Sequence, residues 1–273
     1  MRPVQPYFAL SAGTYFKRSV QKNGIAHFYE YTCEHADHDQ VLAVPDASID
    51  LIFDIGDGNV QARAVGTVLN GTPVENARDH QYFGVRFQPG VKPGFLHGSF
   101  SDYVGESIEL SVCSRVPYLT EMAADCSTFQ ERAALLTNVV LKSLFAQESE
   151  IRHTMTKDNL VEAVKKEILL TSGSIRISEL AEYTGYSSRY IDRIFKEYTG
   201  ISPKTFCRIT RFQSTLDRLD HDTVTSLSDL AADCGYYDQP QFIRDFRRCM
   251  DTTPKTYRQA IVENDYAGKF VMV

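Results

Sequence analysis

Two short stretches of the sequence gather arginine, glutamine and aspartate at intervals of one to four residues. The first holds Arg189, Asp192 and Arg193, and the second holds Gln241 and Arg244. Residues three and four apart lie on one face of a helix. Arginine can donate two hydrogen bonds to guanine, glutamine can pair with adenine, and a carboxylate can accept from cytosine. Each stretch could therefore read base edges, unless Asp192 serves only to orient Arg189 or Arg193.

Both stretches lie within a segment that occurs twice in the chain. The copies "ISELAEYTGYSSRYIDRIFKEYTGISPKTF" and "LSDLAADCGYYDQPQFIRDFRRCMDTTPKTY" share a Gly-Tyr pair and a Pro-Lys-Thr end. A repeat of this kind indicates one structural unit used twice. Each copy predicts a short helix, a glycine turn and a second helix, which is a helix-turn-helix, at about 177–200 and 227–251. In the second copy Ser226 and Asp238 are predicted helix caps, and Pro240 is tolerated in the first turn.

The second helix of a helix-turn-helix enters the major groove of DNA with its first residues near the bases. The side chains predicted to read bases are Ser188, Arg189, Asp192, Arg193, Gln239, Gln241 and Arg244. Basic side chains predicted to contact phosphates, which position a protein without reading sequence, are Lys196, Lys204, Arg208, Arg211, Arg247 and Arg248. The intervening stretch "PKTFCRITRFQSTLDRLDHD" predicts a helix that fixes the spacing of the two units. A helical bundle that does not bind nucleic acid is the alternative.

The remaining chain predicts an α+β protein with two main domains. Residues 1–117 contain short apolar runs broken by glycine and proline turns, which favour a β-rich barrel or sandwich. Residues 118–155 predict a helical connector that could also pair two copies of the chain, and 156–262 predict the all-helical domain, followed by a tail at 263–273. The net charge is −6, with the acidic excess in the N-terminal half. The first residues lack a secretory signal and no apolar run is long enough to span a bilayer, so we expect a cytoplasmic protein without membrane contact.

A small-molecule site is predicted within the β-rich half. Arg86 alternates with apolar residues in a probable strand, and a buried arginine there would attract an anionic ligand. The alternative is an internal ion pair of Arg86 with Asp50 or Asp54. The residues predicted to contact an effector are Arg86, Tyr82, Phe87 and His97, although aromatic residues at strand spacing are more often core. If no effector exists, this half would act through contact with another protein.

Metal binding and catalysis find little support in the sequence. The stretch "CEHADHD" collects metal-ligand types, but such clusters in polar loops are usually solvated turns; its members are Cys33, His35, Asp37, His38 and Asp39. Motifs for nucleophilic, phosphate-binding, metalloprotease or dinucleotide chemistry are absent. We therefore expect no metal, no cofactor and no enzymatic activity.

Residues 158 to 260 closely resemble the DNA-binding domain of the AraC/XylS family of bacterial transcription regulators, on the two quoted copies and the stretch that joins them. The resemblance implies two helix-turn-helix units joined by a long helix, double-stranded DNA and RNA polymerase as partners, and a homodimer as one form. Asp251 stands where that family usually has glycine. Pro240, at a matching base-facing position, has no donor and no polar side chain. The stretches "PDASIDLIFDIG" and "FGVRFQPG" are similar to a sensor module found ahead of such domains, with Ala47 in place of glycine.

Overall fold

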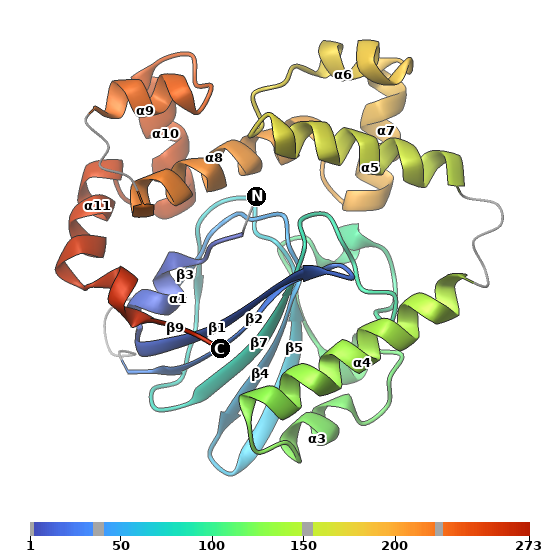
Figure 1. Cartoon of the computed structure of the whole chain (residues 1–273), viewed down its shortest axis with the longest axis vertical. Coiled ribbons are helices and arrows are strands. Elements are labelled where there is room, and N and C mark those ends of the chain that lie inside the picture. Colours follow the sequence, from blue (N-terminus) through green and yellow to red (C-terminus); the bar gives the residue numbers. More distant parts are fainter. Residues whose placement is uncertain (1–2, 35–40, 149–154, 222–225) are drawn as a thin grey trace.

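The computed structural model describes residues 3–34, 41–148, 155–221 and 226–273. A β-rich N-terminal half lies beneath a helical C-terminal half, with the long helix α4 beside the sheet (Figure 1). The predicted α+β class is therefore confirmed.

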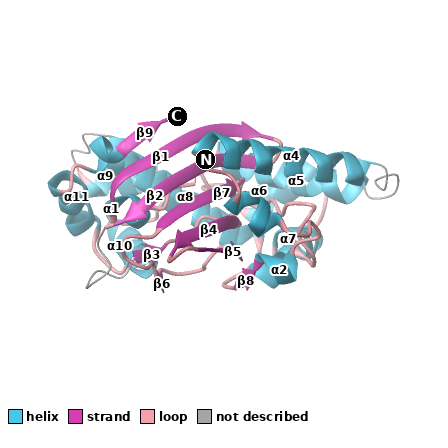
Figure 2. Cartoon of the chain, turned by 90° about the horizontal axis from the view of Figure 1, so that it is seen from below, coloured by secondary structure: helices cyan, strands magenta, loops and turns pink. Residues whose placement is uncertain are grey.

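The N-terminal half contains a seven-stranded sheet in the order β8-β5-β4-β7-β2-β1-β9. Its strands are antiparallel neighbours, except that β9 runs parallel to β1 (Figure 2). A second sheet has two strands, β3 and β6. The strands are β1 (Ala12–Lys22), β2 (Ile25–Cys33), β3 (Val41–Ala43), β4 (Asp50–Gly56), β5 (Asn59–Val65), β6 (Thr72–Val74), β7 (Gln81–Phe87), β8 (Ser107–Glu109) and β9 (Phe270–Met272).

Alternation along β7 divides its side chains between two faces of the sheet, because successive residues of a strand point to opposite sides. Phe83, Val85 and Phe87 belong to the apolar cluster that includes α3 (Leu119–Ala124) and α4 (Phe129–Glu148). Tyr82 lines a cavity on the other face, and so does Arg86. One face of the sheet is thus closed by α3 and α4, and the other carries the cavity.

A buried ion pair adds to the attachment of α4. The Arg132 guanidinium lies 3.0 Å from the Glu30 carboxylate of β2, and both side chains are largely shielded from water. The connection from α2 (Leu110–Cys113) through α3 to α4 therefore packs on the sheet rather than extending from it.

The C-terminal half is a chain of helices, of which α8 is the longest. Its elements are α5 (Met155–Leu170), α6 (Ile177–Thr184), α7 (Ser188–Thr199), α8 (Pro203–His221), α9 (Leu227–Asp233), α10 (Gln239–Met250) and α11 (Pro254–Glu263). In Figure 1, α8 runs between the pair α6–α7 and the pair α9–α10. No helix within the described ranges has the length and hydrophobicity needed to cross a bilayer.

The last residues of the chain return to the first domain. After the short helix η2 (Tyr266–Lys269), β9 pairs with β1, and the Lys269 ammonium donates to the carbonyls of Leu10 and Ala12 at 3.0 and 2.6 Å. The sequence predicted only a tail here. The sheet of the N-terminal half is therefore completed by the C-terminus of the chain.

The two halves also share an apolar core. One cluster of buried residues joins Phe8 of α1 (Pro6–Leu10) and Tyr15 of β1 to Phe212 of α8 and Tyr257 of α11. Burial of such aromatic side chains is a large favourable contribution to folding. The helical half is consequently packed on the sheet and not merely linked to it.

Candidate nucleic-acid interface and sensor cavity

The first predicted helix-turn-helix is formed by α6 and α7. Gly185 ends α6 at φ 73°, a left-handed conformation that glycine adopts without a steric penalty. The Ser187 hydroxyl then caps α7 by accepting from the backbone N–H of Tyr190 at 3.3 Å. The predicted base-reading and phosphate-contacting side chains of this helix are all exposed: Ser188, Arg189, Asp192, Arg193 and Lys196.

Arg193 is held by an aromatic neighbour on the same helix. Its guanidinium lies 5.2 Å from the centre of the Tyr190 ring, and that ring stacks on Tyr186 with 5.1 Å between centroids. Cation–π contact of this kind contributes on the order of 0.5–1 kcal/mol at an exposed site. Arg193 therefore projects into solvent with part of its conformational freedom already removed.

The second unit is formed by α9 and α10 with the predicted caps in place. The Ser226 hydroxyl accepts from the N–H groups of Ser228 and Asp229, and the Asp238 carboxylate accepts from Gln241 N–H at 2.7 Å. Pro240 occupies the first turn of α10, where a missing N–H costs little.

The predicted reading residues of α10 differ in their freedom. Arg244 is exposed, whereas Gln239 and Gln241 are half-buried. The Gln241 side-chain oxygen accepts from the Tyr237 N–H at 2.9 Å. Arg244 is thus the least constrained of the three side chains in this helix.

Asp251 ends α10 in a left-handed conformation at φ 52°, at the position where the resembling family usually has glycine. A non-glycine residue in this region costs roughly 1 kcal/mol or more. We expect Asp251→Gly to raise the free energy of unfolding by about 0.5–1 kcal/mol, measured by urea denaturation. A loss of stability would show that the carboxylate makes a compensating contact.

Both recognition helices turn their C-terminal ends toward the N-terminal half. The end of α7 packs on η1 (Phe100–Tyr103), where a Cβ on Gly200 would lie 2.9 Å from the backbone of Ser101. At the end of α10, the Met250 carbonyl accepts from the Tyr7 hydroxyl at 2.9 Å. The N-terminal ends of both helices lie on the side away from the N-terminal half (Figure 1).

Two of the predicted phosphate contacts are engaged within the protein. Arg208 donates to the Leu69 carbonyl at 3.0 Å, and Arg211 donates to the Gly173 carbonyl at 2.8 Å while lying over the Tyr236 ring. Both arginines are only half exposed, since their long side chains cover neighbouring backbone. Their contact with phosphates stays a prediction, and each guanidinium already has one partner within the protein. Side chains that are exposed are Lys196, Lys204, Arg247 and Arg248.

A basic groove of about 670 Å³ separates the two units. It is lined by α6, α8 and α10, and its charged residues are Arg176, Lys204, Arg208, Arg211, Asp245 and Arg248. Arg176, which is exposed just before α6, was not among the predicted DNA contacts. It lies in the loop before a helix, where the sequence carries no periodic signal.

The other face of the sheet holds a cavity of about 660 Å³. Asp50 on β4 lies opposite Arg86 on β7 in the strand register, and its carboxylate takes two hydrogen bonds from the guanidinium. The Tyr29 hydroxyl also donates to Asp50, at 2.9 Å. The ion pair considered as the alternative for Arg86 is therefore present, with Asp50 rather than Asp54.

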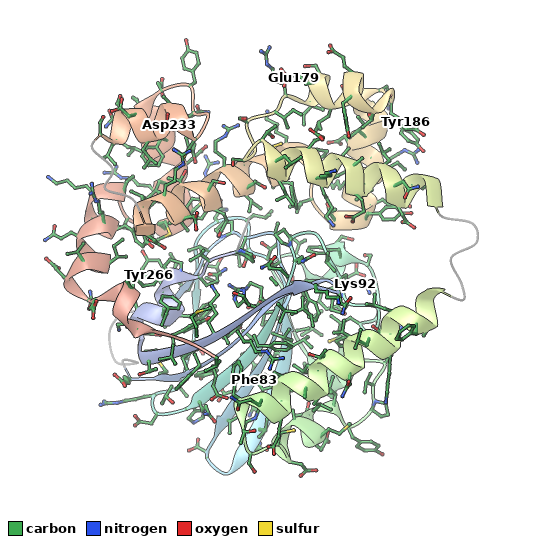
Figure 3. All side chains as sticks on the ribbon, viewed as in Figure 1. Phe83, Lys92, Glu179, Tyr186, Asp233 and Tyr266 are labelled. Atoms are coloured by element: carbon green, nitrogen blue, oxygen red, sulfur yellow. The ribbon has the colours of Figure 1, made fainter. Side chains whose placement is uncertain are left out.

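The four predicted effector contacts are divided by the structure. Arg86 and Tyr82 line the cavity. Figure 3 draws the side chains of the described residues as sticks on the ribbon. Phe87 does not, because it follows Arg86 in β7 and so belongs to the apolar cluster on the opposite face. His97 is exposed in the loop after β7 and is not part of the cavity lining. The inclusion of Phe87 and His97 is corrected accordingly.

The stretch "CEHADHD" lies mostly outside the residues that the structure describes. Cys33 is buried at the end of β2. His35, Asp37, His38 and Asp39 fall outside the described residues.

Two protein families match separate parts of the chain. Residues 180–260 match a helix-turn-helix domain family, and residues 22–109 match a domain of unknown function, DUF6597. The transcriptional activator RhaR of Pectobacterium carotovorum is 28% identical over 144 residues, covering 50% of this chain and 49% of that protein. The F1 operon positive regulatory protein of Yersinia pestis is 33% identical, covering 38% of this chain and 34% of that protein.

The helix-turn-helix match and these relatives identify the C-terminal domain. Residues 180–260 form a helix-turn-helix domain of the AraC/XylS type. The chain spans about half the length of the RhaR relative and about a third of the length of the Yersinia pestis regulator. The relatives are regulators rather than enzymes, which agrees with the prediction of no catalytic activity.

A solved structure similar to the AraC/XylS-type domain is that of a probable AraC family transcriptional regulator from Rhodopseudomonas palustris. It is 32% identical, covers 37% of this chain and 95% of that chain, and aligns with a TM-score of 0.34.

Proposed function

We propose that this chain is a sequence-specific DNA-binding transcription regulator in which one polypeptide reads two adjacent major-groove segments. The division proposed is a sensor in residues 1–117, a connector in 118–155 and the DNA-binding domain in 156–262. The observation that carries the proposal is the orientation of α7 and α10. Each presents exposed arginine on its surface, Arg189 on α7 and Arg244 on α10, while its C-terminal end packs on the sensor half. Regulation of transcription would then involve contact with RNA polymerase.

Binding to genomic DNA fragments, including the region beside its own gene, tests this proposal. The affinity should depend on fragment sequence at low and at moderate salt, because base contacts persist when phosphate contacts weaken. Binding that ignores sequence and disappears with added salt would contradict the base-reading role.

We further propose that a small molecule in the sensor cavity controls DNA binding. Two segments that line the cavity continue directly into contacts with the helical half. The first is the turn 44–48, in which Asp46 and Ser48 line the cavity, and the second is the loop 66–71, in which Thr67 and Val68 do so. A ligand that displaced either segment would change contacts made by α8 and α10.

The turn 44–48 contacts both α8 and the core of the first helix-turn-helix. The Pro45 carbonyl accepts from Gln213 of α8 at 2.8 Å. Ala47 is fully buried in the apolar cluster that contains Val164 and Phe206. Its φ of 60° places this alanine in the left-handed region, and its N–H donates to the Thr67 hydroxyl at 2.9 Å. A displacement of Asp46 or Ser48 would therefore alter contacts that the turn makes with the DNA-binding helices.

The loop 66–71 contacts two basic residues of the helical half. The Leu69 carbonyl accepts from Arg208, and the Gly71 N–H donates to the Arg248 carbonyl at 3.0 Å. A Cβ on Gly71 would lie 2.6 Å from the Cys249 carbonyl oxygen, so this approach needs glycine. Movement of the loop would release the Arg208 side chain, which could then reach a phosphate.

Gln213 provides a direct test of this coupling. Its buried side chain accepts from Val4 N–H at 2.8 Å and donates to the carbonyls of Val4 and Pro45. Gln213→Leu removes these bonds and leaves buried backbone groups unpaired, so the free energy of unfolding should fall by about 1 kcal/mol. Urea denaturation measures the loss, and Gln259→Leu, at an exposed position on α11, is the control. Equal effects of the two changes would contradict a structural link through Gln213.

A second candidate function is contact between two copies of the chain through the connector, in place of small-molecule control. Phe145 near the end of α4 is 69% exposed, and the adjacent Leu144 is 36% exposed. Apolar residues on an exposed helix could pair two copies of the chain. A mass that increases with protein concentration in wild type but not in Phe145→Glu would favour this reading, and a monomer at all concentrations would reject it.

A further inference from the structure

The cavity of the sensor half has apolar walls and a polar floor. Walls are supplied by residues such as Ile52, Val65, Val68 and Tyr82, and the floor by buried groups around Asp46, Asp50 and Arg86. Small-molecule sites commonly combine apolar walls with a few convergent polar groups that set specificity. The floor therefore determines which chemical class the cavity accepts.

Two buried carboxylates share one cation at this floor. The Arg86 Nε lies 2.7 Å from Asp50 and 3.4 Å from Asp46, and the three side chains are at least nine-tenths shielded from water. The remaining partners of Asp46 are neutral donors, the Gln5 amide at 3.0 Å and the Ser48 N–H at 2.9 Å. One guanidinium cannot neutralise two ionised carboxylates, so the floor carries one uncompensated negative charge when Asp46 and Asp50 are both ionised.

The ionisable residues nearer the opening do not offset this charge. Asp54, Glu75 and Arg63 also line the cavity. The Asp54 carboxylate lies 2.7 Å from Nδ1 of His80. Arg63 carries one positive charge, whereas Asp54 and Glu75 are two carboxylates, so these three residues together add no net positive charge to the cavity. An anionic ligand would meet these carboxylates, and the Nε and Nη2 groups of Arg86 already donate to Asp50.

A buried and unpartnered hydroxyl marks the same floor. Ser48 lines the cavity, is only 2% exposed, and its Oγ has no hydrogen-bond partner among the described residues. A buried polar group without a partner costs on the order of 1–3 kcal/mol. A polar ligand bound beside the carboxylates could supply the hydrogen-bond partner that the Ser48 hydroxyl lacks.

We infer that the cavity binds a small organic cation, an amine or ammonium group carried on an apolar body. The cation lies against the carboxylates of Asp46 and Asp50 and within reach of the Ser48 hydroxyl, and the apolar body contacts Ile52, Val65 and Val68. This inference rests on the proposed effector control and names its ligand class. The earlier expectation of an anionic ligand at Arg86 is replaced, because the guanidinium is already paired.

Burial supports the same reading of the floor. It raises the pKa of Asp46, the Arg86 guanidinium opposes that rise, and the Asp50 carboxylate adds to it. The cost of holding a second carboxylate charge here is what a bound cation would remove.

Three probes of one size test the charge preference in the full chain: n-butylammonium, n-butanol and butyrate. A ligand that binds only the folded state raises the thermal midpoint, and above its dissociation constant the stabilisation grows with the logarithm of the ligand concentration. We expect this logarithmic increase with n-butylammonium and a much smaller effect of n-butanol and butyrate. Equal or greater stabilisation by butyrate or n-butanol overturns the inference, and so does no stabilisation by n-butylammonium.

Asp46→Asn then locates the site. It removes one carboxylate charge with little change of shape, and binding of n-butylammonium should weaken about tenfold, the equivalent of one charge-assisted contact. Glu121→Gln removes an exposed charge on α3, outside the cavity lining, and should leave binding unchanged. Equal loss in both variants would place the cation elsewhere. If Asp46→Asn does not fold, Ser48→Ala is the second variant, with the same direction expected.

Failure of this inference is distinguishable from failure of the proposed function. DNA selectivity is measured with and without n-butylammonium, so its absence under both conditions rejects the regulator proposal whatever the probes do to stability. Stabilisation by a neutral or anionic metabolite, with DNA selectivity intact, rejects the cation class alone.

Discussion

Arg86→Met lowers the free energy of unfolding by about 3–5 kcal/mol, the cost typical of removing one partner from a buried ion pair. The change leaves the carboxylates of Asp50 and Asp46 without their shared cation in a site shielded from water. It also removes the guanidinium from the face of the Tyr29 ring, where its carbon lies 5.5 Å from the ring centre. Urea or thermal unfolding measures the loss.

Arg78→Met is the matched control for this prediction. Arg78 is exposed and lies 3.9 Å from Asp79, so its replacement should change stability by less than about 1 kcal/mol. A loss below about 1 kcal/mol for Arg86→Met as well would mean that the floor of the cavity tolerates two carboxylates without a cation. That result would also weaken the electrostatic argument for a cationic ligand.

Arg193→Ala weakens binding to a selected DNA site by about 1–3 kcal/mol and relaxes the preference at one base position. Arg193 is exposed on α7 and held against Tyr190, so little of its conformational freedom remains to be lost on binding. Quantitative binding to the selected site and to single-base variants measures both effects.

Lys196→Ala is the control that separates base reading from phosphate contact. Lys196 is exposed one turn further along α7, where a lysine would meet the backbone of DNA. Its loss should weaken binding to all sequences alike and reduce the salt slope by about one. If Arg193→Ala behaves in the same way, Arg193 contacts phosphate and the base-reading assignment is wrong.

The helical half was largely predictable because its signals are local. Gly185, Ser226 and Asp238 occupy the turn and cap positions that the sequence indicated. Turns and caps depend on residues a few positions apart, so they can be found without knowing the tertiary structure.

Contacts between distant segments could not be predicted in the same way. The pairing of β9 with β1 joins the two ends of the chain, and three residues at a chain end give no periodic signal. The engagement of Arg208 by Leu69 depends on how the two halves pack, which basic side chains alone do not reveal.

The error at Phe87 was avoidable. Arg86 and Phe87 are consecutive in a strand, and the alternation of strand residues already places them on opposite faces. The sequence left Asp50 and Asp54 as alternative partners of Arg86. Choosing between them requires the register of β4 and β7, which places Asp50 opposite Arg86.

Selection of binding sites from a random DNA library tests the central claim most directly, because the claim is that one chain reads two segments with two helices. The wild-type protein should select an asymmetric site with two parts about one helical turn, roughly 10 base pairs, apart. Arg193→Ala should relax the preference within one part, and Arg244→Ala within the other. A single uninterrupted motif that both variants weaken evenly, or no selected motif at all, would contradict the account.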